Sequence, residues 1–317
     1  MATPETIARK IEKRISEAVD GFGKSVPSHQ QSVLDEIEML LKDLDVKNGR
    51  IEQSIANLKL IGRIKEKLRK LIAGNEWKSA VKDYAATFDE IGKLQNEYFT
   101  AIVGKFKPPA ILSEIRSQTI DATLVSLTGS GLDAAITERL QTILRTNITT
   151  GASYTKLMKQ VRSFLTTDET GAGAMERYTK QITTDALNQY SRQYVNTVSS
   201  DLGLEWYKYT GAIIEGSRAF CRALVKKKFI HVSEIPNILK GDFKEFEDED
   251  GEINEKTGLP DGMIAGTTPE NFYVYAGGYQ CGHHLNPITA SQVPLQIIRS
   301  IPRSKLGRES ITVLNGK

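Results

Sequence analysis

Apolar residues recur with helical spacing through the first hundred positions of the chain. Ile7, Ile11, Ile15 and Val19 stand four residues apart among charged residues, a pattern that predicts an amphipathic helix over residues 5–19. The apolar stripe of such a helix is narrow and is surrounded by charge. We therefore expect this helix to pack against a partner surface.

Three further helical patterns follow before residue 105. Gly21, Gly23 and Pro27 break the first pattern, and a helix is predicted from Ser32 to about Leu44. Residues 51–71 repeat apolar positions over about three heptads, which fits an intramolecular hairpin or bundle as well as an oligomeric coiled coil. Residues 76–103 carry an aromatic and aliphatic side, which predicts a third long helix.

The middle of the chain is also predicted to be helical. Pro108 and Pro109 stop one helix and stiffen the exit from it, so we place a segment boundary there. Small, polar turn sequences then separate four helical patterns, at residues 110–127, 131–147, 153–167 and 174–202.

The character of the sequence changes after Gly203. The run LEWYKYTGAII is aromatic and β-branched, which predicts a strand, and EGSRAFCRAL predicts a turn into a short helix. The acidic, Gly-containing run at 240–262 is expected to form a long mobile loop. Prolines at 287, 294 and 302 indicate an extended tail that docks on another surface.

These patterns predict a mainly α fold with a small α+β C-terminal module. The expected segments are an N-terminal helical hairpin or bundle that serves as an interaction region (1–105), a helical part (110–202), the small α+β module with a Cys/His cluster (203–290) and an extended tail (291–317). We expect a chain that lacks residues 1–105 to keep the C-terminal module folded.

Composition narrows the class of protein without naming it. Hydrophobic residues make up 39% and charged residues 26% of the 317 residues, which is typical of a soluble folded chain. The net charge of +3 is too small to predict a nucleic-acid partner. No apolar run approaches the ~18–20 residues that span a bilayer, and the first residues lack the apolar core of a signal peptide, so we expect no membrane partner and a cytoplasmic origin.

Metal-binding residue types cluster in the last third of the sequence. Both cysteines, Cys221 and Cys281, and three of the four histidines, His231, His283 and His284, lie between positions 221 and 284. Thiolate and imidazole are donors that suit zinc, although the chain has no CxxC pair. If a metal binds, we expect Cys221, Cys281 and one of His283 or His284 as ligands, with His284 preferred and His231 as the fourth.

Two other interpretations of the cysteines remain open. In the first, Cys221 is a small apolar core residue and the histidines form loop hydrogen bonds, so that no cofactor binds. In the second, Cys221 and Cys281 form a disulfide, although the reducing environment of the cytoplasm disfavours disulfide formation. Among other motifs, HExxH, GxSxG, GxxxxGK[ST] and the zinc deaminase pattern are absent, and the acidic run around Gly251 fails the EF-hand register. We therefore predict neither an enzyme nor a small-molecule substrate.

Basic residues raise the question of contact with DNA. The helix predicted over residues 51–71 interleaves its basic positions with Ile64, Leu68 and Leu71, which is typical of the solvated side of an amphipathic helix. A second basic set lies in the C-terminal third: Lys226, Lys227, Lys228, Arg299, Arg303, Lys305 and Arg308. The second set supports the alternative of an internal DNA-binding or ejected protein.

One region of the sequence resembles a known family. The pieces are, in order, ITERLQTILRTNITTGASYTKLMKQVRSFL, MERYTKQITTDALNQYSRQYVNTVSSDLGLEWYKYTG, EGSRAFCRALVKKKFIHVSEI and GGYQCGHHLNPI. Together they cover about Ile136 to Ile288 and resemble the phage Mu F-protein-like minor head protein family, also called the phage head morphogenesis domain. In that family a helix pair leads to a long helix, a strand, a cysteine-bearing turn with a short helix, a variable loop and a closing motif. Two departures stand out, because many relatives carry a cysteine where this chain has Arg218, and the closing motif here is CGHH.

The resemblance implies a structural minor capsid protein of a tailed bacteriophage. Such a protein is made in the host cytoplasm, is present in few copies in the virion, in the head interior or at the portal vertex, and serves head morphogenesis or DNA delivery. Its implied partners are the portal protein and other head proteins, with packaged DNA as a further contact. The competing enzyme hypothesis is a metal-dependent hydrolase or nuclease that uses the Cys/His cluster.

Overall fold

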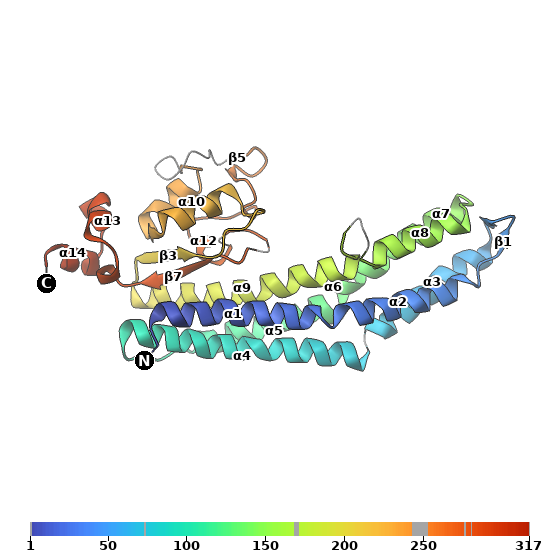
Figure 1. Ribbon diagram of the computed structural model, residues 1–317, viewed down its shortest axis with the longest axis horizontal. Helices are drawn as coiled ribbons and strands as arrows, with labels where there is room; N and C mark the ends of the chain where they lie inside the picture. The colour runs from blue at the N-terminus through green and yellow to red at the C-terminus, as the bar shows by residue number, and fades with distance from the viewer. Residues whose placement is uncertain are drawn as a thin grey trace. The chain divides into compact units, whose positions relative to one another are not determined.

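The computed structural model describes residues 2–72, 74–167, 171–242, 253–275, 277–279 and 281–316, and it is mainly helical with a few short strands (Figure 1). The predicted fold class, mainly α with a small α+β module, is confirmed. The chain divides into two compact units. The α+β unit contains Met1–Ile15, Phe88–Gln118 and Thr184–Lys317, and the helical unit contains Ser16–Thr87 and Thr119–Thr183. These limits differ from the segment limits expected from the sequence, because both units are discontinuous along the chain.

Helices account for nearly all of the first two hundred residues. Their bounds are α1 (Pro4–Gly23), α2 (Val26–Leu41), α3 (Ile55–Ile72), α4 (Asn75–Val103), α5 (Ile111–Thr128), α6 (Ser130–Leu132), the π-helical η1 (Asp133–Glu138), α7 (Arg139–Thr149), α8 (Tyr154–Leu165) and α9 (Ala174–Leu202). Strands β1 (Val46–Lys47) and β2 (Arg50–Ile51) form a small antiparallel hairpin between α2 and α3. None of the described helices is long and apolar enough to cross a membrane.

Helix α1 ends at Gly23, within the predicted break, but Pro27 does not delay the start of the second helix. Helix α2 already begins at Val26, so that the proline lies in its first turn. A proline is tolerated there because the first backbone N–H groups of a helix have no partner within the helix. The predicted start at Ser32 was therefore too late.

The apolar stripes of the N-terminal helices are buried within the chain itself. In the helical unit, Leu60, Ile64 and Leu68 of α3 are each 1% exposed, and α3 packs against α2 and α7. In the α+β unit, Ile7 and Ile11 of α1 are buried in the same way. These buried positions of α3 pack within the chain, as in the intramolecular bundle that was one of the two alternatives.

The basic side of α3 is largely paired with acidic side chains. Arg63 lies 3.3 Å from Asp43, Lys67 lies 3.0 Å from Glu36, and Arg69 lies 2.5 Å from Asp133. Exposed pairs of this kind contribute little stability. The prediction of a solvated helix face agrees with this arrangement.

His29 makes the stability of the helical unit depend on pH. Its ring stacks on Trp77, with 4.8 Å between ring centroids, and its Nε2 is buried without a hydrogen-bond partner among the described residues. Burial lowers the pKa of His29, against a smaller opposing effect of Glu76. The folded state therefore binds its proton more weakly than the unfolded state, and the stability from neutral His29 is present above about pH 6.5 and lost as the pH falls.

We expect His29→Gln to weaken this acid sensitivity. Urea unfolding at pH 7.5 and pH 5.5 would show a smaller loss of stability for the variant than for the natural chain. The lost stacking on Trp77 would lower stability equally at both pH values, so it does not affect the comparison. Equal pH dependence of the two proteins would contradict the prediction.

The α+β unit is built on a three-stranded antiparallel sheet. Strand β3 (Trp206–Thr210) lies at its centre, between β4 (Phe229–His231) and β7 (His284–Ile288). Helix α10 (Ala219–Lys227) connects β3 to β4 and packs against both (Figure 1). Two short helices, α11 (Ile235–Ile238) and α12 (Phe272–Tyr275), follow in the connection to β7.

The predicted acidic loop at 240–262 is only partly described. Residues 243–252, including Gly251, lie outside the described residues. The part from residue 253 is not an irregular loop, because β5 (Ile253–Asn254) and β6 (Leu259–Pro260) pair as an antiparallel hairpin. The turn between them places Gly258 at a positive φ of 67°, which favours glycine.

The C-terminal residues are folded, not extended. They form the 3-10 turns η3 (Ala290–Gln292) and η4 (Arg303–Lys305) and the helices α13 (Leu295–Ser300) and α14 (Arg308–Leu314). Pro294 and Pro302 stand at the N-caps of α13 and η4, where proline is compatible with the start of a helix. Ile298 and Leu306 pack in one apolar cluster with Trp206. The prediction of an extended tail was therefore wrong.

Candidate metal centre

The fold brings the two cysteines together. Cys221 lies in the first turn of α10 and Cys281 lies just before β7, and their Sγ atoms are 3.9 Å apart. Both side chains are buried, with exposed fractions of 1% and 4%. The cysteines are free. A disulfide needs an S–S distance of about 2.05 Å, so the two cysteines are neighbouring thiol groups that are not bonded to each other.

His283 completes a group of three potential ligands. Its Nδ1 lies 3.4 Å from Cys281 Sγ, and the ligand atoms of Cys221, Cys281 and His283 all lie within 4.8 Å of one another. The His283 ring stacks on Tyr209 at 5.5 Å between centroids, while a Cβ at Gly211 would come within 2.5 Å of the same ring. The imidazole is thus held in place from both sides.

His284, which the sequence analysis preferred as a ligand, is not a member of this group. It is the first residue of β7 and pairs with Thr210 of β3. Successive side chains of an extended segment point to opposite faces, so His283 and His284 do not face the cysteines together. Burial, with a smaller effect of the Arg192 charge, lowers the pKa of His284 to about 3. In the structure, His283 and not His284 is the histidine that lies next to the two cysteines.

His231, the predicted fourth ligand, also has different partners. Its ring packs against Trp206 at 4.8 Å between centroids, and its Nδ1 is hydrogen-bonded to Ser233. Its Nε2 lies 3.6 Å from Glu205 Oε2. These contacts place His231 in the apolar cluster around Trp206, and it does not belong to the cysteine group.

A backbone segment presses closely against the two sulfurs. A Cβ at Gly277 would lie 2.0 Å from Cys281 Sγ and 2.9 Å from Cys221 Sγ, so any side chain at this position would collide with both sulfurs. Arg218 holds this segment, because its guanidinium donates to the carbonyl oxygens of Gly277 at 2.7 Å and Tyr279 at 2.8 Å. The arginine that replaces a cysteine of many relatives therefore supports the loop of the site.

Arg192 of α9 anchors the other side of the loop. Its guanidinium is buried and donates to the backbone carbonyl oxygens of Cys281 and His283, the latter at 2.9 Å. A hydrogen bond from Cys221 lowers the pKa of the Cys281 thiol, and His283 and the Arg192 charge act in the same direction. Cys281 is thus the residue of the pair that is favoured as a thiolate.

The donor set and its burial define what the group can do chemically. Two sulfurs and one imidazole nitrogen are donors that Zn²⁺ and related soft or borderline ions prefer. The three residues are between 1% and 6% exposed, which is typical of a structural metal site and not of one that admits a substrate. The chain can therefore hold a metal ion here, and the ion would link α10 to the residues before β7.

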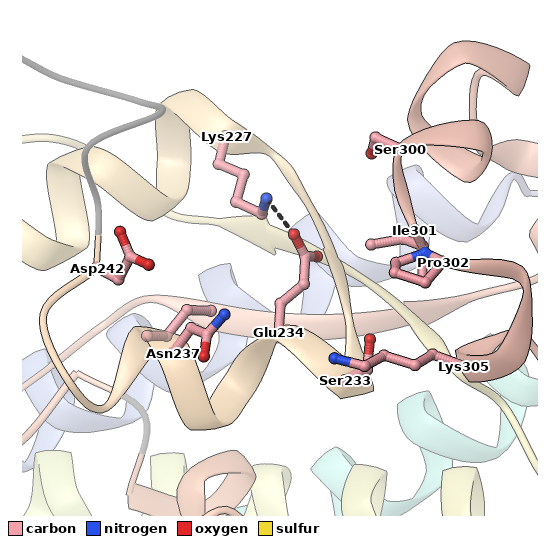
Figure 2. A pocket seen from close by; sticks show the side chains of 10 residues that line it. Lys227, Ser233, Glu234, Asn237, Asp242, Ser300, Ile301, Pro302 and Lys305 are labelled. Atoms are coloured by element: carbon pink, nitrogen blue, oxygen red, sulfur yellow. Dashed lines mark hydrogen bonds and ion pairs between the residues drawn. The ribbon is translucent and has the colours of Figure 1, made fainter.

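A separate hollow of about 270 Å³ lies between α10, α11 and the C-terminal residues. Figure 2 shows Lys227 pointing toward Glu234 in this hollow, and the Lys227 Nζ donates to Glu234 Oε1 at 2.6 Å. The Lys227 side chain is 9% exposed. Lys227 was one of the basic residues that motivated the DNA-binding alternative, but its charge is already paired within the fold.

Sequence reasoning found the two cysteines but not all residues of the group. The choice of His283 over His284 depends on the register of β7, which no local pattern reveals. Gly277 carried a weak signal in the Gly-Gly pair before Cys281, since paired glycines mark close backbone approach. Arg192 carried none, because an arginine in a long helix ordinarily faces solvent.

Comparisons of the chain with protein-family models, with curated proteins and with solved structures find no match.

Proposed function

We propose that this chain is a structural minor head protein of a tailed bacteriophage, associated with the portal vertex and acting in head morphogenesis or DNA delivery. Its partners are the portal protein and other head proteins, and it functions as an assembly component rather than as an enzyme. The virion is its final location.

The order of elements between residues 136 and 288 carries this proposal. Helices α7 and α8 form a pair joined by a Gly-Ala-Ser turn, in which Ser153 Oγ caps α8 by accepting the Lys156 N–H at 3.2 Å. The long helix α9, the strand β3, the cysteine-bearing α10 and the closing strand β7 follow in sequence. The same order is what the resemblance to the phage head morphogenesis domain implies.

The contact with head proteins is best placed on the segment from α2 to α3. Most positions of the apolar stripes of the N-terminal helices are buried within the chain, so they are not free for a partner. In contrast, four large apolar side chains of this segment are solvent-exposed: Met39, Val46, Ile55 and Leu58. Ile55 is 74% exposed, which makes it the most exposed of the large apolar side chains described.

Quantitative mass spectrometry of purified particles tests the main proposal. We expect this chain at a few copies for each portal ring, far below the abundance of the major capsid protein. Absence of the chain from particles would contradict the proposal and would indicate a transient assembly factor or an enzyme.

A double substitution tests the contact surface. We expect Ile55→Lys with Leu58→Lys to reduce incorporation into particles several-fold, while stability changes by no more than about 0.5 kcal/mol for each exposed site. Ile111→Lys is the matched control, because Ile111 is an isoleucine that is 58% exposed in the α+β unit. Equal incorporation of both variants would place the contact elsewhere.

The metal-dependent hydrolase is less well supported by the geometry. A catalytic metal keeps a coordination position that substrate can reach. Cys221, Cys281 and His283 are all buried, and Tyr209 and Gly277 cover the group further. Turnover of a phosphodiester by the zinc-loaded chain, abolished in Cys281→Ser, would favour the enzyme over the structural protein.

A further inference from the structure

We propose that Cys221, Cys281 and His283 bind one divalent, thiophilic metal ion of the Zn²⁺ class. The ion fixes α10 to the loop that leads into β7. This inference goes beyond the role in the phage head and does not depend on it, because it follows from the arrangement of the donor atoms.

Two of the three distances between the donor atoms match those of one tetrahedral ion. With bonds of about 2.3 Å to sulfur and about 2.0 Å to nitrogen, a tetrahedral zinc ion sets its sulfur ligands about 3.8 Å apart and a sulfur–nitrogen pair about 3.5 Å apart. The observed Sγ–Sγ distance is 3.9 Å and the distance from Cys281 Sγ to His283 Nδ1 is 3.4 Å. The third pair, Cys221 and His283, has its ligand atoms within 4.8 Å of each other, so all three donors lie close enough to share one ion.

The surroundings hold the donors in this arrangement. Tyr209 and Gly211 pack against the His283 ring. Arg192 donates hydrogen bonds to the backbone carbonyl oxygens of Cys281 and His283 and so holds the backbone of both ligands. Ligands whose rotamers are fixed by packing and hydrogen bonds form a preorganised site. His283, which is 6% exposed, directs a ring nitrogen toward the sulfurs from a position that solvent does not reach.

Gly277 supplies an independent observation. A Cβ at this position would lie 2.0 Å from Cys281 Sγ and 2.9 Å from Cys221 Sγ, so only glycine lets the backbone approach both sulfurs this closely. The backbone before β7 is thereby held against the cysteine pair.

The ion would connect segments that are distant in sequence. Cys221 and Cys281 are 60 positions apart, and Cys281 and His283 are held in one loop. Binding replaces the thiol protons by the metal, so two protons leave when both sulfurs coordinate as thiolates. Because an ion that binds only the folded state stabilises it, loading should raise the melting temperature of the chain.

The experiment uses the full chain, purified under reducing conditions and stripped of metal with a chelator. It is then given either Zn²⁺ or Co²⁺ alone, and free ion is removed. We expect about one ion for each chain, a sulfur-to-cobalt charge-transfer band with the visible spectrum of tetrahedral Co²⁺, protection of both cysteines from alkylation, and a higher melting temperature.

Single substitutions distinguish this donor set from the other histidines. Cys281→Ser and His283→Gln should lose stoichiometric binding and the cobalt spectrum. His284→Gln is the matched control, because His284 is the adjacent residue and is equally buried at 6% exposed. The His284→Gln variant should keep stoichiometric binding and the cobalt spectrum, and so should His231→Gln. Circular dichroism checks that each variant is folded.

Three results would overturn the proposal. The first is a reduced natural chain that retains neither ion. The second is binding that survives His283→Gln but is lost in His284→Gln. The third is an intact mass lower by two hydrogens in the chain as isolated, which identifies a disulfide. If the cysteine variants fail to fold, alkylation protection and the cobalt spectrum of the natural chain decide the question. The particle measurement above can fail independently of any of these results.

Discussion

A chain that begins at residue 106 is expected to lose the fold of its α+β unit. Residues 1–15 and 88–105 belong to that unit, and they are part of its core. Ile7 and Ile11 of α1 and Phe99 of α4 are each less than 5% exposed. Removing a buried isoleucine side chain costs about 2–5 kcal/mol and a buried phenylalanine about 3–5 kcal/mol. The sum approaches the whole stability of a typical domain, about 5–15 kcal/mol.

Polar contacts would be lost together with the apolar core. Tyr98 donates its hydroxyl to the carbonyl oxygen of Pro287 at 2.8 Å, at the point where β7 pairs with β3. Thr210 of β3 donates to Glu12 of α1 at 2.9 Å. Without residues 1–105, the Pro287 carbonyl and the Thr210 hydroxyl would lose these partners, which adds to the cost.

Circular dichroism and limited proteolysis of residues 106–317 would test this expectation. We expect little cooperative unfolding and rapid cleavage of the shortened chain. A chain without residue 2, which is exposed, is the control and should unfold like the full chain. A shortened chain with a cooperative transition and protected Cys221 would contradict the prediction. The expectation reverses the one drawn from the sequence, in which the C-terminal module folds without residues 1–105.

Deletion of residues 294–317 should destabilise the α+β unit by roughly 4 kcal/mol or more, because the buried Ile298 and Leu306 each contribute about 2–5 kcal/mol. Trp206 would lose its packing partners and the hydrogen bond from its Nε1 to Ser310 Oγ at 2.9 Å. Glu205 would lose the backbone N–H of Gly307, which donates to it at 2.9 Å.

Urea unfolding followed by tryptophan fluorescence measures this effect directly. The chain has two tryptophans, so a Trp77→Phe background leaves Trp206 as the single reporter. Removal of residues 316 and 317 alone is the control and should change stability by less than about 0.5 kcal/mol. An unchanged midpoint after deletion of residues 294–317 would mean that these residues do not stabilise the unit.

The sequence predicted those elements whose periodicity is long and continuous. The predicted helices at 76–103 and 174–202 correspond to α4 (Asn75–Val103) and α9 (Ala174–Leu202), since one amphipathic face runs through most of each. The prolines were misinterpreted in both directions. Pro27 starts a helix, and Pro294 and Pro302 precede helical turns, because a proline ends one element and begins the next equally well.

The candidate site was predictable in its residue types but not in its exact membership. Clustering of Cys221, Cys281 and three histidines was visible in the sequence. Which histidine faces the sulfurs depends on the register of β7, and a shift of one residue exchanges His283 for His284. His231 was excluded by β4, which pairs it across from Trp206. These choices are made by tertiary pairing, which a local pattern does not contain.

The discontinuous α+β unit has a consequence for synthesis on the ribosome. Helix α1 leaves the ribosome first, yet the strand that carries its partner Thr210 follows almost two hundred residues later, and β7 later still. At about 5–20 residues per second, β7 follows α1 after roughly 15 to 60 seconds. During that interval α4, which belongs to the same unit, is already made, but the contacts of α1 with β3 are still missing. The first helix to be made therefore completes its native contacts only after the strands of the sheet have followed, which makes the folding of this unit depend on contacts between distant parts of the chain.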